Sequence, residues 1–281
     1  MTKKHTKPKK NKFPSFYALV KNTLFEVITF WRPLLAILAV YAVIYFVFVL
    51  GLSLSNNSQD LMSDGSKIGD ALNVAFGQFF GGVLIGTAAS DTTLVVQFIL
   101  FLVASLAFIW TLRKLQGLKK IKIKDAYYLG NAALIPVIII SLVLILTFIP
   151  ALIGSTILTV SIQSASTLLE TVIVSVLAFV LLMLSLYLFV MFWPAFYIVT
   201  LPKNYPLGAL KASIKITKKR RLLLLRKIFL WFVLLPIVMF VLLVLGALIW
   251  EAVVPSLAFI LFLASFGLSH AYLYMLYREL L

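Results

Sequence analysis

Residues 211–250 read KASIKITKKRRLLLLRKIFLWFVLLPIVMFVLLVLGALIW, a basic segment that runs directly into an apolar one. The apolar part, residues 228–250, contains no charged side chain. A helix of roughly 20 apolar residues is long enough to cross a bilayer core of about 30 Å. This stretch therefore predicts a transmembrane helix that is preceded by a cationic segment at one membrane surface.

The same alternation recurs along the chain, in which 63% of the residues are hydrophobic and 12% are charged. That composition is typical of a membrane protein and lies far from soluble globular usage. We predict an all-α fold, a polytopic membrane helix bundle with interfacial amphipathic helices, in a single domain over residues 13–281. Residues 1–12 form a polar, Lys-dense tail that we expect to be disordered. The six predicted spans are residues 33–54, 92–112, 131–152, 171–193, 228–250 and 253–277.

The distribution of cations predicts the orientation of these spans. Of the 25 Lys and Arg residues, 24 lie in segments 3–32, 113–124 and 203–227 or at Arg278. Most acids lie in the alternate gaps, namely Asp60, Asp64, Asp70, Asp91, Glu170 and Glu251. Short loops rich in Lys and Arg stay in the cytoplasm. We therefore expect a multi-pass protein of the cell membrane with its N- and C-termini cytoplasmic.

Residues 14–31 form the first candidate interfacial helix. Their period is helical, with one apolar face (Phe16, Val20, Leu24, Val27, Trp31) and a more polar one (Ser15, Ala18, Asn22, Glu26, Thr29). A helix of this kind after a basic tail is expected to lie in the inner interface of the membrane. Packing flat against the bundle is the alternative, and the two arrangements are compatible.

A second candidate begins at Pro206 and runs into the basic cluster. Leu207, Leu210, Ile214 and Thr217 share one side of this helix, and the lysines share a neighbouring flank. We expect contact with anionic lipid headgroups, although a solvated basic loop helix is the alternative. The net charge of +16 also raises nucleic acid as a partner, but cations interleaved with spans favour lipid. The candidate headgroup contacts are Lys211, Lys215, Lys218, Lys219, Arg220 and Arg221.

Two further segments leave alternatives open. Residues 71–90 are uncharged and long enough to form a seventh span, but only about two residues would remain for the turn back. We predict that they form an interfacial or re-entrant helix instead. Residues 153–170 are semi-polar, and we expect them to lie on the outer face.

Several of these features resemble a known family. They are the proline turn around Pro202 and Pro206, the Ala-Leu-Lys-Ala-Ser segment at residues 209–213, and the C-terminal sequence YLYMLYREL at residues 272–280. Together with six spans after an amphipathic helix, they resemble the YciC-like six-span membrane proteins. They are also similar to the membrane domain fused to some glycerophosphodiester phosphodiesterases. The resemblance implies a helical bundle without enzymatic activity, since the soluble phosphodiesterase domain has no counterpart here.

A search for catalytic or metal-binding residues finds few candidates. The chain has no cysteine, which excludes disulfides, thiolate metal sites and cysteine catalysis. Of the two histidines, His5 lies in the tail and His270 lies within the last span. An ionisable residue inside a span is a functional candidate, but a structural role as a hydrogen-bonding partner suits His270 equally. Asp91, Asp125 and Glu251 lie at span edges, where capping or solvation is expected. We predict no catalytic residue, metal site or cofactor.

Three function classes remain after these exclusions. The first is a non-enzymatic envelope or membrane scaffold that interacts with lipid and with membrane-protein partners. The second is a transporter or channel component for a small or apolar substrate, although coupled transporters usually carry charge at the midplane. The third is an enzyme of lipid metabolism, for which no nucleophile or base can be named. We expect the first class and keep the transporter as the alternative.

Overall fold

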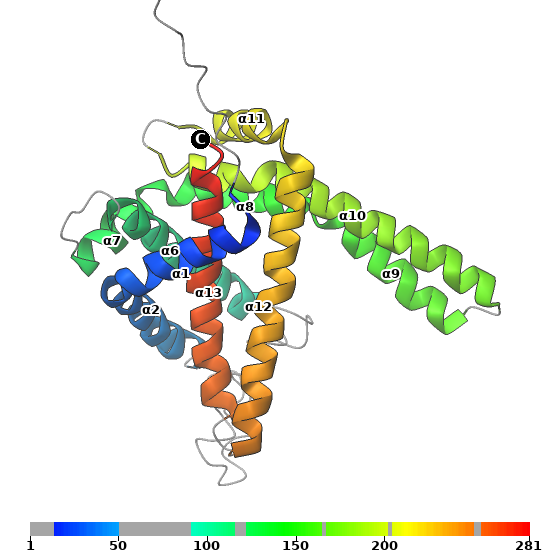
Figure 1. Ribbon diagram of the computed structural model, residues 1–281, viewed down its shortest axis with the longest axis horizontal. Coiled ribbons are helices and arrows are strands. Elements are labelled where there is room, and N and C mark those ends of the chain that lie inside the picture. The colour runs from blue at the N-terminus through cyan, green and yellow to red at the C-terminus, as the bar shows by residue number, and fades with distance from the viewer. Residues whose placement is uncertain (1–13, 51–90, 116–121, 165–166, 202–203, 250–253) are drawn as a thin grey trace, which may run out of the picture.

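The computed structural model describes residues 14–50, 91–115, 122–164, 167–201, 204–249 and 254–281, and the regular structure of these residues is entirely helical (Figure 1). The all-α prediction is therefore confirmed. The predicted tail, the segment 71–90, His5 and Glu251 lie outside the described residues. The helices are α1 (Phe16–Thr29), α2 (Trp31–Tyr45) with a π-helical extension (Phe46–Leu50), α6 (Asp91–Leu115), α7 (Ile123–Gly130), a 3₁₀ turn (Asn131–Ala133), α8 (Leu134–Leu146), α9 (Ile149–Ser164), α10 (Leu168–Ile198), α11 (Pro206–Thr217), α12 (Arg221–Ile249) and α13 (Val254–Arg278).

Six helical segments of the described residues are long and apolar enough to cross a membrane. They are Trp31–Phe48, Val95–Leu115, Ile123–Ser161, Leu168–Ile198, Arg221–Gly246 and Ser256–Arg278. Each overlaps one of the six spans predicted from the sequence, although the bounds differ. The chain thus has the architecture of a multi-pass membrane protein.

The third segment is longer than predicted and contains a break. At Thr147 the backbone N–H bonds to both Val143 O and Leu144 O, at 3.2 and 3.1 Å, and Phe148 N bonds to Ile145 O. Such i→i+3 bonds tighten the helix, which ends as α8 and restarts as α9. The first N–H groups of a new helix need outside partners. Ser185 of α10 accepts from the N–H of Ala151 at 2.8 Å and so stabilises the restart.

Residues 153–164, the first part of the segment 153–170, continue α9 along α10. The expected place of this segment at the outer face stays a prediction. The two helices approach closely at Gly154. A Cβ at this position would lie 3.2 Å from the carbonyl oxygen of Ala178 and 3.2 Å from the Cβ of Leu181. The absence of a side chain therefore allows this contact, and α9 and α10 form an apolar hairpin.

The core of the protein surrounds α13, which contacts α1, α2, α6, α10 and α12. Aromatic side chains fill much of this centre. Trp231 of α12 stacks on Tyr272 of α13 with ring centroids 4.2 Å apart and an interplanar angle of 4°. Tyr41 of α2 stacks on Phe266 in the same way, at 5.6 Å. Ring pairs of this kind add to the packing energy that holds membrane helices together.

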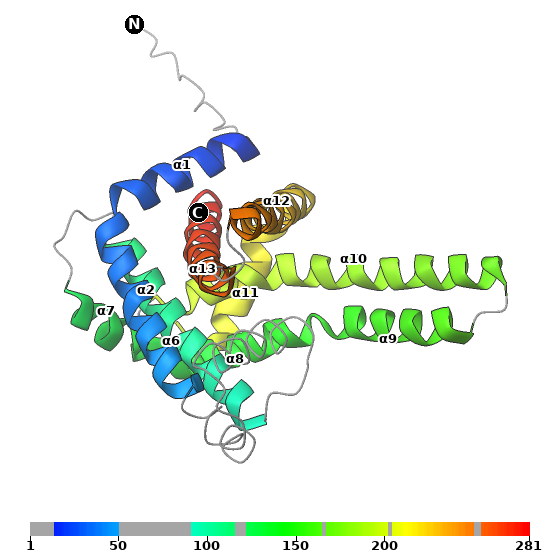
Figure 2. The same cartoon turned by 90° about the horizontal axis from the view of Figure 1, so that it is seen from below.

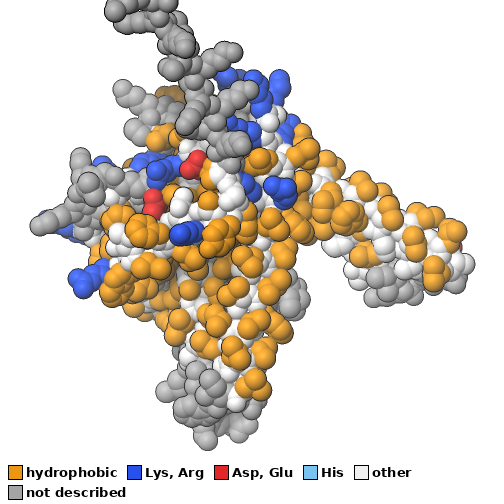
Figure 3. Space-filling model, in the orientation of Figure 1, with side chains coloured by type: hydrophobic (Ala, Val, Ile, Leu, Met, Phe, Trp, Pro, Cys, Tyr) orange, Lys and Arg blue, Asp and Glu red, His pale blue; other side chains and the backbone are white. Residues whose placement is uncertain are grey.

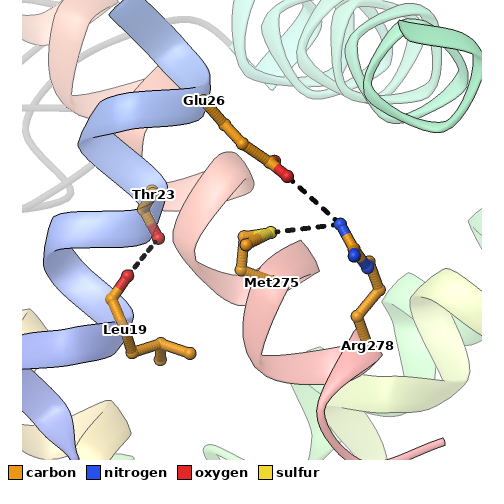
Figure 4. Close-up of polar contacts among 5 residues, drawn as sticks. All are labelled: Leu19, Thr23, Glu26, Met275 and Arg278. Carbon is orange, nitrogen blue, oxygen red and sulfur yellow. Dashed lines mark hydrogen bonds and ion pairs between the residues drawn. The ribbon is translucent and has the colours of Figure 1, made fainter. Parts of the chain in front are cut away.

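The first helix, α1, packs across α13. Leu19 and Thr23 are buried, and Glu26 pairs with Arg278 at 3.1 Å (Figure 4). The predicted apolar face is split, because Phe16, Val20 and Val27 pack on the core whereas Leu24 and Trp31 are 41% and 51% exposed. The helix thus follows the flat-packing alternative and keeps a second apolar surface outside.

The long helices point in different directions. In Figure 2, α12 and α13 are viewed along their axes, whereas the α9–α10 hairpin lies lengthwise and extends away from the core. The base of the hairpin is fixed by the C-terminal part of α10, where Trp193, Ala195 and Tyr197 are buried. The distal part packs mainly on its own partner helix, so its outer side chains are exposed and apolar.

Cationic helix ends that are far apart in the sequence meet at one end of the protein. Arg113, near the end of α6, donates to Thr200 after α10. Arg220, just before α12, donates to the backbone carbonyl of Glu279 after α13. In Figure 3, Lys and Arg side chains gather over this end, whereas the α12–α13 and α9–α10 hairpins present hydrophobic side chains.

Candidate functional site

The predicted basic helix is divided into a helix and a turn. Lys211 and Lys215 lie on α11, which ends at Thr217. Lys218, Lys219 and Arg220 form the turn that follows, and Arg221 opens α12. The four lysines are exposed to the surroundings. The structure therefore brings the predicted residues together in one basic cluster, Lys211–Arg221, although they do not share a continuous helix.

The side of α11 that faces the protein coincides only in part with the predicted apolar side, of which Thr217 is buried and Leu210 packs against the core. The buried residues are Ala209, Ser213 and Thr217, whereas Leu207 is 73% exposed. These small side chains recur every four residues and let α11 lie close against α10. Ser213 also donates to Met191 O at 2.7 Å, in the turn before Pro194. The packing of α11 on α10 therefore depends on small residues that let the two backbones approach, and not on large apolar side chains.

The two arginines of the basic cluster are held by the protein. Arg221 donates to the hydroxyl of Tyr187, and its guanidinium carbon lies 5.4 Å from the centroid of that ring. Arg220 donates to Glu279 O at 3.4 Å. We infer that these arginines anchor the turn between α11 and α12. The lysines are then presented outward from a fixed base.

His270 is buried in the centre of the protein, where α13 meets α6. Its Nε2 lies 3.1 Å from Ser105 Oγ. Ser105 Oγ also donates to Phe101 O at 2.7 Å. With the serine proton in that bond, the hydroxyl accepts from His270, whose own proton is then on Nε2. His270 Nδ1 then carries a lone pair that has no hydrogen-bond partner in the described part of the chain.

Four aromatic rings surround the imidazole of His270. The centroid of Phe266 is 4.7 Å away, and those of Phe101, Phe108 and Phe196 are 6.1, 6.2 and 6.3 Å away. A neutral imidazole in this position packs with its neighbours and joins α13 to α6. Within the described residues, no group of three His, Cys, Asp or Glu side chains is placed to hold a metal ion. The structural role and the functional role of His270 both stay predictions.

The predicted acidic edge positions are only partly described. Asp125 lies in the first turn of α7 and is exposed, as expected for a residue that stabilises a helix N-terminus. Asp91 is the first residue of α6.

Sequence reasoning missed a cavity of about 420 Å³ between α6, α7, the start of α8 and the chain that follows α10. Arg113 and Lys114 line it together with Trp110 and Asn204. In the sequence analysis, Arg113 and Lys114 contributed only to the predicted orientation of the spans in the membrane. The signal that could have found the site is the run of Trp110, Arg113 and Lys114 on the last turns of a span.

Comparisons with family models, with curated proteins and with solved structures gave no match. The resemblance to the YciC-like proteins therefore stays a prediction from the quoted residues. Function must be inferred from the geometry of this chain.

Proposed function

We propose that the protein is a non-enzymatic multi-pass membrane protein whose basic end binds the anionic headgroups of one leaflet. The observation that supports this most is the convergence of cationic helix ends at one end of an otherwise apolar molecule. The basic cluster Lys211–Arg221 adds four exposed lysines on a base that its arginines fix. Each cation near an anionic membrane surface contributes about 1 kcal/mol before screening by salt.

The basic end is proposed to face the cytoplasm, with both termini on that side. Lys and Arg in short loops are retained in the cytoplasm during insertion. Six spans also return the chain to the side from which it started. The protein would thus act as a scaffold of the inner leaflet, with lipids and membrane proteins as partners.

We expect single cysteines, introduced into this cysteine-free chain, to report that orientation. An impermeant thiol reagent added outside intact cells should label Ser63→Cys and Ser164→Cys. It should leave Gln116→Cys and Lys215→Cys unlabelled until the membrane is permeabilised. Labelling of either of the last two from outside would contradict the proposed orientation.

Replacing Lys211, Lys215, Lys218 and Lys219 together by Gln should weaken the preference of the protein for anionic lipid. In reconstituted bilayers, the association of spin-labelled phosphatidylglycerol relative to phosphatidylcholine should fall at least about threefold, because four surface cations are removed. For the unaltered chain, raising the salt concentration should reduce the preference in the same direction.

A variant with Arg at the same four positions provides the control, because it keeps the charge and should keep the preference. An unchanged preference in the Gln variant would contradict the proposal. Tighter binding of RNA than of anionic bilayers by the unaltered chain would favour nucleic acid as the partner instead.

A further inference from the structure

The cavity beside Trp110 has one cationic wall. Arg113 donates to Thr200 O at 3.0 Å, to Thr200 Oγ1 at 2.8 Å and to Tyr197 O at 3.4 Å. These contacts fix the guanidinium in place. The ammonium of Lys114 lies 5.5 Å from the centroid of the Trp110 ring. No Asp or Glu is among the described residues that line the cavity. Two positioned cations therefore face this space without a carboxylate to neutralise them.

Most of the remaining lining is apolar. Leu106 and Leu129 line the cavity from α6 and α7, Pro136 from α8, and Val199 and Leu201 from the chain that follows α10. Leu129 is half exposed, so this wall lies at the surface of the protein. A ligand that pairs with the cations and also packs on the apolar residues must combine an anionic group with a hydrocarbon part. Free phosphate would leave the apolar wall without a contact.

The position of the cavity agrees with an amphiphilic ligand. It lies where α6 and α10 end, and the last turn of α6 is where an apolar helix gives way to the cations Arg113 and Lys114. Basic pockets between transmembrane helices at this depth are suited to lipid headgroups. A volume of about 420 Å³ is within the range of small-molecule sites. It can take a phosphate with its glycerol, while the acyl chains continue into the bilayer.

We propose that this cavity binds one anionic phospholipid, with its phosphate at Arg113 and Lys114 and its glycerol region against the apolar wall. Asn204 lines the same space, and its Nδ2 donates to Ile198 O at 3.0 Å. The amide oxygen is thereby left to accept from a headgroup hydroxyl. The inference rests on the proposed function, because it requires this end of the protein to lie at a leaflet surface. It adds a discrete site of fixed stoichiometry to the diffuse attraction of the basic cluster.

Native mass spectrometry of the full-length protein in neutral detergent tests the site directly. Phosphatidylglycerol should give one bound molecule that persists at lipid concentrations where phosphatidylcholine gives none. Lys114→Gln should weaken this binding about tenfold, since one charge-assisted contact is lost. Ala132→Phe, which adds a ring to the lining, should weaken it as well. Lys114 is chosen over Arg113 because Arg113 also holds the end of α10.

Two control variants separate the cavity from the basic cluster. Lys122→Gln removes an exposed cation at the same end of the protein and should leave the single bound lipid in place. The variant with four Gln substitutions on the basic cluster should lose the bilayer preference and keep the bound lipid. If the unaltered chain shows no preference for anionic bilayers, the proposed function is contradicted. If it shows that preference but binds no single lipid, only the cavity proposal is contradicted.

Three outcomes would overturn the proposal. Equal binding of phosphatidylcholine would show that charge is not recognised. Inorganic phosphate or glycerol phosphate that binds as tightly as phosphatidylglycerol would assign the cavity to a soluble phosphate. A single bound lipid that survives Lys114→Gln and Ala132→Phe unchanged, or is lost in Lys122→Gln, would place it elsewhere.

Discussion

Gly130→Val should lower the free energy of unfolding by about 3 kcal/mol, because α7 lies directly against the backbone of α6 at this residue. A Cβ on Gly130 would come within 3.1 Å of both Ala107 Cα and Leu106 O, and 3.3 Å from Ala107 N. These are backbone atoms of a long helix and cannot rotate away. Relief requires α7 to move outward. Thermal unfolding of the detergent-solubilised protein, followed by circular dichroism, should show the loss.

Gly208→Ala is the matched control, because a Cβ at Gly208 meets no atom within 4 Å. Gly208 lies in the first turn of α11, where alanine should leave stability unchanged or raise it by up to about 1 kcal/mol. Equal stability of the Gly130→Val variant and the unaltered chain would contradict the close contact of α6 and α7.

His270→Ala is the second substitution with a large expected effect, a loss of about 3 kcal/mol. It removes the hydrogen bond to Ser105 and leaves a space among four aromatic rings, and such core truncations typically cost 2–5 kcal/mol. His270→Gln keeps hydrogen-bonding capacity at similar size and should recover most of the loss. Both variants are compared by thermal unfolding and by resistance to proteolysis in detergent.

The His270→Gln variant also distinguishes a structural histidine from a histidine that relays protons. A structural residue predicts that His270→Gln preserves folding and any cellular phenotype. A relay predicts a pH-dependent flux in reconstituted vesicles that His270→Gln abolishes while the fold stays intact. The second result would make the transporter the leading function. A double-mutant cycle with Ser105→Ala would measure the coupling between the two side chains.

The helices were predictable because their signal is local. A charge-free run such as residues 228–250 must be helical in a membrane whatever surrounds it, since its backbone has to satisfy its own hydrogen bonds. The basic cluster was found for the same reason, as its members are near neighbours in sequence. Hydropathy therefore predicted the six apolar segments, and the local run of Lys and Arg gave the six cationic candidates.

Features that depend on contacts between distant residues were not predictable. Pro150 is a local signal for the break near Thr147, because a proline ring clashes with the carbonyl four residues earlier, at the end of α8. The partner that stabilises the restart, Ser185, lies on another helix and leaves no local signal. The orientation of α11 depends on small residues that fit against α10, and the apolar period of Leu207, Leu210 and Ile214 did not reveal them. Arg113 and Lys114 belonged to a known basic stretch, but only folding brings them beside the loop that carries Asn204. The partner of His270, Ser105, likewise lies 165 positions away.

The packing of α1 on α13 has a consequence for how the protein is made. Glu26 and Arg278 are separated by 252 positions, and Lys227 meets the carbonyl of Pro14 across a similar distance. At a synthesis rate of about 5–20 residues per second, the first helix leaves the ribosome tens of seconds before its partner. Until then its buried face, with Leu19 and Thr23, has no α13 to cover it. The last helix to be made thus completes the core around which the earlier ones pack.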